Sequence, residues 1–285
     1  MGQLRDRMEV DLRLAGYSPS TRKIYLLYAR LFTKYHMRPP ADMGEEEIRQ
    51  YLLHMVEEKR ISRETYRQIR AALIFLYTVT LKRSAEVEHL PVRRKSVKLP
   101  VVLSGTEVKS LLEAVRSPKY RAIVMAQYGG GLRISEACRL RPEDIDSKRM
   151  VIHVRAGKGG RDRYTVLSGR FLAFLRDYFR KNRPKEWLFP GQTTAGHVSP
   201  ETSRRVFHAA VAAAGISKKV TPHVLRHCFA THLLECGVDI AVIQALLGHG
   251  SLRATEVYTH VSVEHIGRVK SPLDLLGTQD AAKLA

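Results

Sequence analysis

The chain has 285 residues, which is enough for one large domain or two ordinary domains with hydrophobic cores. Apolar residues make up 44% and charged residues 27% of it, and this balance excludes an intrinsically disordered chain. Because 48 lysines and arginines outnumber 28 acidic residues, the net charge is +20, and we expect a polyanionic partner, nucleic acid first and an anionic membrane second.

The first part of the chain is predicted to be helical throughout. Residues 22–36 carry apolar side chains at helical spacing behind a capping sequence that begins at Ser18. Acidic residues open a second helix over residues 45–59, and Ser62 precedes a long helix over residues 63–81. These patterns predict a helical domain over residues 1–87.

A proline-punctuated, basic stretch over residues 88–100 is predicted to be an extended linker. Residues 1–99 carry 20 basic and 12 acidic side chains, a net charge of +8, and the remainder carries 28 and 16, a net charge of +12. Because both halves are basic, both can contact the same polyanion. We therefore expect a second domain, with a C-terminal tail, over residues 101–285.

The second half is predicted to combine helices with a small sheet. Residues 150–155 and 162–167 alternate as two strands around a glycine-rich turn, which is typical of an antiparallel hairpin. Helical patterns surround this hairpin, over residues 104–115, 119–128, 170–182, 201–215, 222–237 and 239–248. The predicted fold class is therefore mainly α, with one small antiparallel sheet in the second domain.

A membrane protein or a metal protein does not fit this sequence. The strongest apolar stretch, Ala71–Leu81, is too short to span a bilayer, and the first residues lack the apolar block of a signal peptide. Cys138, Cys228 and Cys236 show no CxxC pattern, so we expect buried thiols rather than zinc ligands, in a reducing cytoplasm.

Simple hydrolase and nucleotidase motifs are missing from the sequence. The acidic residues of the second half are scattered, whereas metal-dependent nucleases need carboxylates clustered around a cation. Gly157-Lys158 lacks the glycine spacing and the following Ser or Thr of a P-loop, and there is no GxSxG motif. We expect no metal and no other cofactor.

Several cationic side chains occupy apolar surroundings in the second half. Arg133 follows a glycine turn and opens a helix, where it either pairs with an acid such as Glu136 or binds an anion. His223 and Arg226 lie three residues apart and share a helix face, which alone favours an ordinary polar pair.

Three further residues are equally ambiguous when taken singly. Lys158 lies at the hairpin tip, where a solvated lysine is the ordinary explanation. His249 lies where a helix ends and is explained by C-capping, and Tyr258 is explained as a core aromatic residue.

The order of these residues resembles the tyrosine recombinase/integrase family. The matching segments are GLRISEACRL, VRAGKGGRDRYTVL, TPHVLRHCFATHLLECG and LLGHGSLRATEVYTH, and the tyrosine follows the Gly-His pair by nine residues (258 − 249). The resemblance covers nearly the whole chain. It implies a SAM-like core-binding domain at the N-terminus and a mixed α/β catalytic domain, of the DNA breaking-rejoining type, over about Val102–Leu276.

The resemblance implies a site-specific recombinase in which Arg133 and Arg226 bind the non-bridging oxygens of a DNA phosphate. Planar, permanently charged guanidiniums suit those oxygens. Tyr258 is the implied nucleophile, which forms a 3′-phosphotyrosyl bond. Because a phenol has a pKa of about 10, it is also a good leaving group, so strands can be rejoined without ATP or metal.

The remaining catalytic positions are implied in the same way. His223 accepts the tyrosine proton or holds a phosphate oxygen, and His249 donates a further hydrogen bond. Lys158 protonates the departing 5′-oxygen.

Basic residues outside the catalytic positions are predicted to contact DNA. Arg63, Arg67 and Arg70 share one face of a predicted helix, and a merely solvated basic face is the alternative. In the linker, the candidates are Arg93, Arg94 and Lys95.

The family also implies a homotetramer acting on two double-stranded DNA sites. Ser271–Leu276 are candidates for docking into a neighbouring subunit, and packing on their own domain is the alternative. A membrane is not an implied partner.

The resemblance leaves the recombinase subtype open. The tail IGRVKSPLDLLG resembles that of integron integrases, but the 65 residues between Lys158 and His223 (223 − 158) leave no room for their extra insertion. The length and domain plan look closer to Xer-type recombinases and transposon-borne integrases. We expect integration or excision of a mobile element, with replicon-dimer resolution second. Topoisomerase-like DNA relaxation of type IB and a non-catalytic DNA-binding protein remain alternatives.

Overall fold

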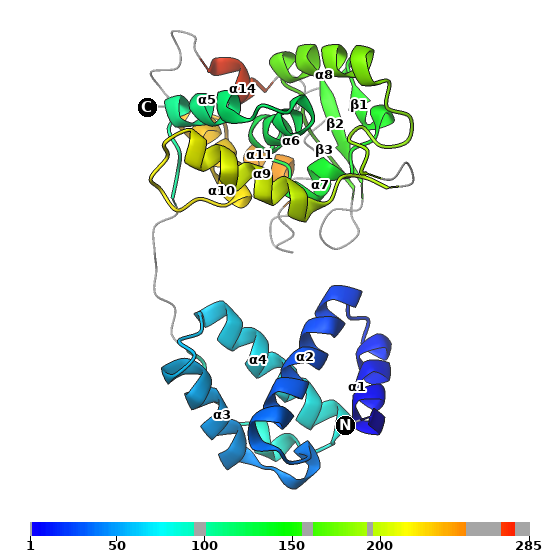
Figure 1. Ribbon diagram of the computed structural model, residues 1–285, viewed down its shortest axis with the longest axis vertical. Coiled ribbons are helices and arrows are strands. Elements are labelled where there is room, and N and C mark those ends of the chain that lie inside the picture. The colour runs from blue at the N-terminus through cyan, green and yellow to red at the C-terminus, as the bar shows by residue number, and fades with distance from the viewer. Residues whose placement is uncertain (1, 94–100, 156–161, 193–195, 249–268, 277–285) are drawn as a thin grey trace. The chain divides into compact units, whose positions relative to one another are not determined.

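The computed structural model describes residues 2–93, 101–155, 162–192, 196–248 and 269–276. The chain forms two compact units, Met1–Lys98 and Leu99–Ala285, here called the N-terminal and the C-terminal unit (Figure 1). The mainly helical fold class with one small antiparallel sheet is confirmed. Among the described residues, no helix combines the length and the apolar character needed to cross a membrane.

The described part of the N-terminal unit is helical. Ser18 and Ser62 cap two of the helices, each accepting a hydrogen bond from the backbone N–H three residues later. Phe32, Ile69 and Tyr77 belong to its buried core. The α-helices are α1 (Gly2–Leu14), α2 (Pro19–His36), α3 (Glu45–Glu57) and α4 (Arg63–Phe75), with 3₁₀ turns at Pro40–Asp42 and Ser84–Val87.

The helix expected over residues 63–81 changes character near its end. The regular α4 stops at Phe75, and a π-helical turn continues over Leu76–Thr80. In this turn the Tyr77 side chain is fully buried, and its hydroxyl donates to Pro40 O at 3.0 Å. The wider turn therefore serves a tertiary contact that helical spacing in the sequence does not reveal.

The C-terminal unit contains a short sheet among helices (Figure 1). Its strands are β1 (Ile145–Asp146), β2 (Val151–Val154) and β3 (Arg163–Val166), antiparallel in the order β1-β2-β3. The predicted hairpin is thus present, with Val151 opposite Val166, but β1 was not predicted. A strand of two residues is too short to produce an alternating pattern.

One helix lies at the centre of this unit. Residues 122–129 of α6 are all buried, and α6 contacts α8, α9, α10 and α14. The described helices are α5 (Gly105–Ala114), α6 (Pro118–Gly129), α7 (Ile134–Cys138), α8 (Gly169–Asn182), α9 (Pro200–Ala213), α10 (Pro222–Glu235), α11 (Ile240–Leu247) and α14 (Pro272–Leu275).

The segment Ser271–Leu276 packs on its own unit, where α14 lies against α6 and α8 (Figure 1). The buried Ser271 hydroxyl donates to Gly129 O at 2.7 Å, and Leu273 is buried beside the same glycine. A Cβ at Gly129 would lie 2.9 Å from Leu273 Cδ2, so the fit needs a glycine there. Of the two alternatives for this segment, the structure shows the packing within the chain.

Asp274 anchors this segment to the start of α8. Its carboxylate accepts hydrogen bonds from Ser168 Oγ at 2.7 Å, Gly169 N at 3.1 Å and Arg170 N at 2.9 Å. Because Asp274→Ala leaves these N-terminal donors without partners, we expect it to lower the unfolding free energy of the C-terminal unit by about 1–2 kcal/mol in urea titrations.

The matched control is Asp177→Ala, which removes an exposed carboxylate from the same helix. It should change the unfolding free energy by less than about 0.5 kcal/mol. Equal losses from the two variants would show that α14 adds nothing to the stability of the unit.

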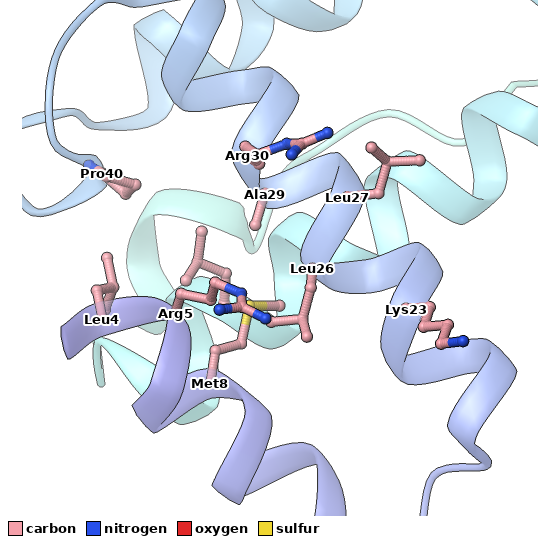
Figure 2. A pocket seen from close by; sticks show the side chains of 10 residues that line it. Leu4, Arg5, Met8, Lys23, Leu26, Leu27, Ala29, Arg30 and Pro40 are labelled. Atoms are coloured by element: carbon pink, nitrogen blue, oxygen red, sulfur yellow. The ribbon is translucent and has the colours of Figure 1, made fainter. Parts of the chain in front are cut away.

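The N-terminal unit carries a pocket of about 390 Å³ between α1 and α2 (Figure 2). Apolar side chains from both helices line it, among them Leu4, Met8 and Leu26. Arg5, Lys23 and Arg30 also line this pocket, but no acid or histidine does. Its lining is therefore apolar with a cationic rim.

Candidate functional site

The turn before α7 brings Arg133 close to α10. Gly131 has φ +64°, and a Cβ there would lie 2.6 Å from the Phe229 ring, so both backbone and space require glycine. Arg133 follows this turn at the N-cap of α7 and is partly exposed. Its side chain can therefore reach a ligand from solvent while its backbone stays fixed.

Arg226 is buried on α10, with 2% of its surface exposed. It donates to Gly131 O at 2.7 Å and to Leu247 O, at the end of α11. Burial lowers the pKa of Arg226 to about 9, and the positive charges of Arg133 and Arg163 add to this effect. The guanidinium is therefore charged at neutral pH but held among other cations.

Glu136 joins these cations. Its Oε2 accepts from Arg133 N at 2.8 Å and its Oε1 accepts from Arg133 Nη1 at 2.5 Å, and Arg226 Nη1 lies 3.9 Å from Oε2. Arg133 therefore pairs with an acid, as one of the two sequence-based interpretations expects. Because this carboxylate also faces Arg226, the pairing leaves positive charge for the anion that the other interpretation expects.

Arg163 is a member of this cluster that the sequence analysis missed. It opens β3 and binds Glu136 with two hydrogen bonds, of 3.1 and 2.7 Å. Because alternate residues of a strand share a face, Arg163 lies on the same face as the buried Thr165. This alternation was the one pattern in the sequence that could have indicated an inward-facing arginine. Val166 is buried on the opposite face, so alternation alone did not reveal which face points inward.

The cluster has an excess of positive charge. Three guanidiniums, of Arg133, Arg163 and Arg226, surround the single carboxylate of Glu136. Such an excess in a partly buried site favours an anion with several oxygens, since each guanidinium carries more donors than Glu136 can accept.

Glu136 makes the stability of this cluster depend on pH. Burial alone would raise its pKa, but the hydrogen bonds from Arg163 and Arg133 lower it to about 2. Because this lies below the value of an unfolded carboxyl, about 4.3, the stabilisation is present above about pH 5 and is lost as pH falls toward 2. Glu136→Gln should therefore lower the free energy of unfolding by about 3 kcal/mol at pH 7. It should also make this free energy depend less on pH in the acidic range.

Chemical denaturation between pH 3 and pH 7 measures this effect. Glu113→Gln, at an exposed position of α5, should follow the wild-type curve. A Glu136→Gln curve parallel to that of wild type would contradict the assignment.

His223 lies one turn before Arg226 on α10, and the residue is accessible to solvent although neighbouring side chains partly enclose its ring. Partial burial of the ring lowers its pKa, and the charges of His227, Arg226 and Arg133 lower it further. The ring lies edge-on to His227 with centroids 4.8 Å apart. A neutral imidazole at neutral pH can accept a proton from a nucleophile.

A basic cleft of about 460 Å³ opens beside Arg133 and Glu136. Arg141 contributes to it and stacks on Trp187, with its guanidinium carbon 4.8 Å from the ring centroid. The other charged residues that line the cleft are Arg139, Asp144, His153 and Arg155. The cleft widens the cationic surface around the cluster.

The other predicted catalytic residues, Lys158, His249 and Tyr258, lie outside the described residues, as do Arg94 and Lys95 of the linker. Two of the described ranges end a few residues before Lys158 and directly before His249 in the sequence. Arg155 precedes the segment with Lys158, and Gly248, with φ +62° after α11, precedes His249.

The predicted DNA contacts of the N-terminal unit have partners within the chain. Arg63 donates to Arg93 O at 2.9 Å, Arg93 donates to Ile61 O at 2.8 Å, and Arg70 donates to Leu90 O at 2.9 Å. These bonds fasten the first linker residues to α4. Arg67, by contrast, is exposed and pairs only with Glu64 among the described residues, so DNA contact stays a prediction for all four arginines.

The cysteine region of α10 has structural partners. Leu103 N donates to the buried Cys228 thiol at 3.2 Å, and the buried His232 ring bonds to the Tyr128 hydroxyl at 2.9 Å. Within the described ranges, no group of three or more His, Cys, Asp or Glu residues is arranged to hold a metal ion.

Residues 101–265 match the model of the phage integrase family, and residues 4–86 match that of the phage integrase N-terminal SAM-like domain. The chain belongs to the phage integrase family. The resemblance read from the motif order is therefore confirmed, and the protein is a tyrosine recombinase of the integrase type.

Relatives along the full chain agree with this assignment. A putative integrase/recombinase of Sinorhizobium fredii is 44% identical over 280 residues, which cover 97% of this recombinase and 90% of the relative. The tyrosine recombinase XerA of Pyrococcus furiosus is 34% identical and covers 93% of this chain and 92% of its own. A lambda integrase dimer bound to a COC′ core site shares the fold, with a TM-score of 0.70 and 21% identity over 88% of this chain and 95% of that one.

Proposed function

We propose that this recombinase cuts and rejoins double-stranded DNA at defined sites through a 3′-phosphotyrosyl bond to Tyr258. The observation that carries the proposal is the cluster of Arg133, Arg163 and Arg226 around one carboxylate, because its excess positive charge suits a phosphate. Charge develops on the non-bridging oxygens as the phosphorus becomes five-coordinate, and fixed guanidiniums stabilise it.

The proposed step moves one proton at each end of the phosphate. The Tyr258 oxygen attacks phosphorus and gives its proton to His223, whose lowered pKa keeps the ring ready to accept it. The bond from phosphorus to the 5′-oxygen breaks, and Lys158 protonates that oxygen. His249 donates a hydrogen bond to the phosphate.

The proposed partner is duplex DNA bound by both units. Contacts are assigned to the face of α4 that bears Arg67, with Arg63 and Arg70 beside it, and to the linker through Arg93, Arg94 and Lys95. The net charge of +20 and the basic cleft beside Arg133 support this partner.

We further propose that four copies act on two sites to integrate or excise a mobile element, in the reducing cytoplasm. The name integrase/recombinase of the 44% identical relative supports this role. The domain plan assigned to the chain is a core-binding domain over residues 1–87, a linker over 88–100 and a catalytic domain over 101–285.

The test uses a nicked suicide DNA substrate, from which a small fragment escapes after cleavage. We expect the wild-type protein to form a covalent adduct at a preferred sequence in the presence of EDTA and without ATP. Strand exchange between two paired sites should follow on intact substrates. Relaxation of any supercoiled plasmid without exchange would instead identify a topoisomerase, and DNA binding without an adduct would identify a non-catalytic protein.

The arginines of α4 should separate into DNA-binding and structural residues. Because the Arg67 side chain is 71% exposed, Arg67→Ala should reduce the slope of log K against log salt concentration by about 1 and leave the melting temperature unchanged. Arg70→Ala should lower the melting temperature, since it removes two hydrogen bonds to Leu90 O. An unchanged salt slope in Arg67→Ala would remove this residue from the DNA interface.

A further inference from the structure

Arg163 connects β3 with α7 and α11 in the C-terminal unit. From the start of β3 it binds Glu136 of α7 with both terminal nitrogens. Its Nε donates to Leu246 O, at the end of α11, at 3.0 Å. Only 9% of the side chain is exposed, so these bonds are made inside the protein.

Arg163 affects the charge of Arg133 and Arg226, the two residues here called the phosphate clamp. Glu136 lies within hydrogen-bond distance of Arg133 and 3.9 Å from Arg226, the two residues assigned to the phosphate. Without Arg163, these two are the only described cations left to compensate the carboxylate. With Arg163 bound to both of its oxygens, Glu136 shares its charge with a cation outside the pair, while Arg133 Nη1 still donates to it at 2.5 Å.

Arg163 also contacts the backbone at Gly248, where α11 ends. A Cβ at Gly248 would lie 2.6 Å from Arg163 Cδ, so the arginine packs directly against the backbone at this corner. Arg163 and Arg226 also donate hydrogen bonds to two neighbouring carbonyls, those of Leu246 and Leu247 respectively. The end of α11 is therefore fixed by the same guanidiniums that surround Glu136.

We propose that Arg163 is a positioning residue for DNA cleavage, which shares the charge of Glu136 so that Arg133 and Arg226 do not compensate it alone, and which fixes the corner at Gly248. This role rests on the proposed function. It is distinct from direct phosphate binding, because the printed bonds of Arg163 go to Glu136 and to the backbone.

The test compares Arg163→Met, Glu136→Gln and the double variant in single-turnover adduct formation on the suicide substrate. Arg163→Met should slow the adduct step by about tenfold to a hundredfold and change DNA affinity less than about threefold, because the clamp is neutralised and not removed. The double variant should be about tenfold faster than Arg163→Met, since a neutral glutamine no longer competes for the clamp.

A purely structural role gives a different result. The two substitutions would then add, and the double variant would be slower than either single one. Arg149→Met, which breaks the exposed pair with Asp146 at the edge of the same sheet, is the matched control and should cleave at the wild-type rate.

Each result of these measurements either supports or contradicts the positioning role of Arg163. If circular dichroism shows that Arg163→Met does not fold, Arg163→Gln with and without Glu136→Gln gives the same comparison, because glutamine also removes the charge but keeps a hydrogen-bond donor. Wild-type rates in the Arg163 variants, or no recovery in the double variant, would overturn the positioning role alone. A wild type that forms no adduct would overturn the proposed function and this role with it.

Discussion

Tyr258→Phe is expected to abolish the covalent protein–DNA adduct. The substitution removes one oxygen, which is the proposed nucleophile, and keeps the rest of the side chain. No water or neighbouring hydroxyl can replace it in forming a phosphotyrosyl bond, so the loss should reach the detection limit of denaturing gel electrophoresis on the suicide substrate. DNA affinity should stay within about threefold of wild type, because the clamp arginines are intact.

The control is Tyr120→Phe, at a half-buried tyrosine of α6, which should form the adduct at the wild-type rate. An adduct that survives Tyr258→Phe, or one that appears only after a divalent metal is added, would refute the assignment of the nucleophile.

Arg226→Lys is expected to slow cleavage by about a thousandfold at pH 8 and to make the rate depend strongly on pH. The site lowers the pKa of the arginine itself to about 9, through burial first and then through Arg133 and Arg163. A lysine starts from a lower pKa, about 10.4, so the same surroundings should leave it mostly uncharged at pH 8. Loss of one fixed charge donor at a transition state typically costs 10²–10³-fold in rate, roughly the effect expected here.

The sign of the pH effect separates charge from shape. The rate of Arg226→Lys relative to wild type should rise as the pH is lowered from 8 to 6, because the ammonium is then regained. Single-turnover rates across this range measure it, with Arg204→Lys, an exposed arginine of α9 paired with Glu201, as a control that keeps the wild-type profile. A constant ratio across the range would show that only geometry was lost.

Much of the fold was accessible from local patterns. Helices α2 and α4 begin where apolar spacing and the caps at Ser18 and Ser62 predict them, since helix periodicity and capping involve residues a few positions apart. The hairpin of β2 and β3 follows from alternation around a glycine-rich turn. The two-residue β1 and the π-turn after Phe75 leave no local pattern, and both were missed.

The candidate site divides in the same way. Arg133, His223 and Arg226 were proposed as site residues because their order along the chain resembles that of the tyrosine recombinase family, and this order can be read from a single sequence. Arg163 was missed because its meaning depends on Glu136, 27 residues away, and on Leu246, 83 residues away. Likewise, nothing near Arg70 in the sequence indicates that its guanidinium binds the Leu90 carbonyl.

The sequence by itself determined the family, the order of the candidate catalytic side chains and the basic character that suits DNA. The tertiary structure decided how the charges are shared: which guanidiniums serve Glu136, which serve backbone carbonyls, and that Ser271–Leu276 pack beside Gly129. The physical reason is that hydrogen bonds and close packing join segments far apart in the chain. The spacing of residues along the sequence records the chemistry that is available, but only the folded contacts determine which partner each charge receives.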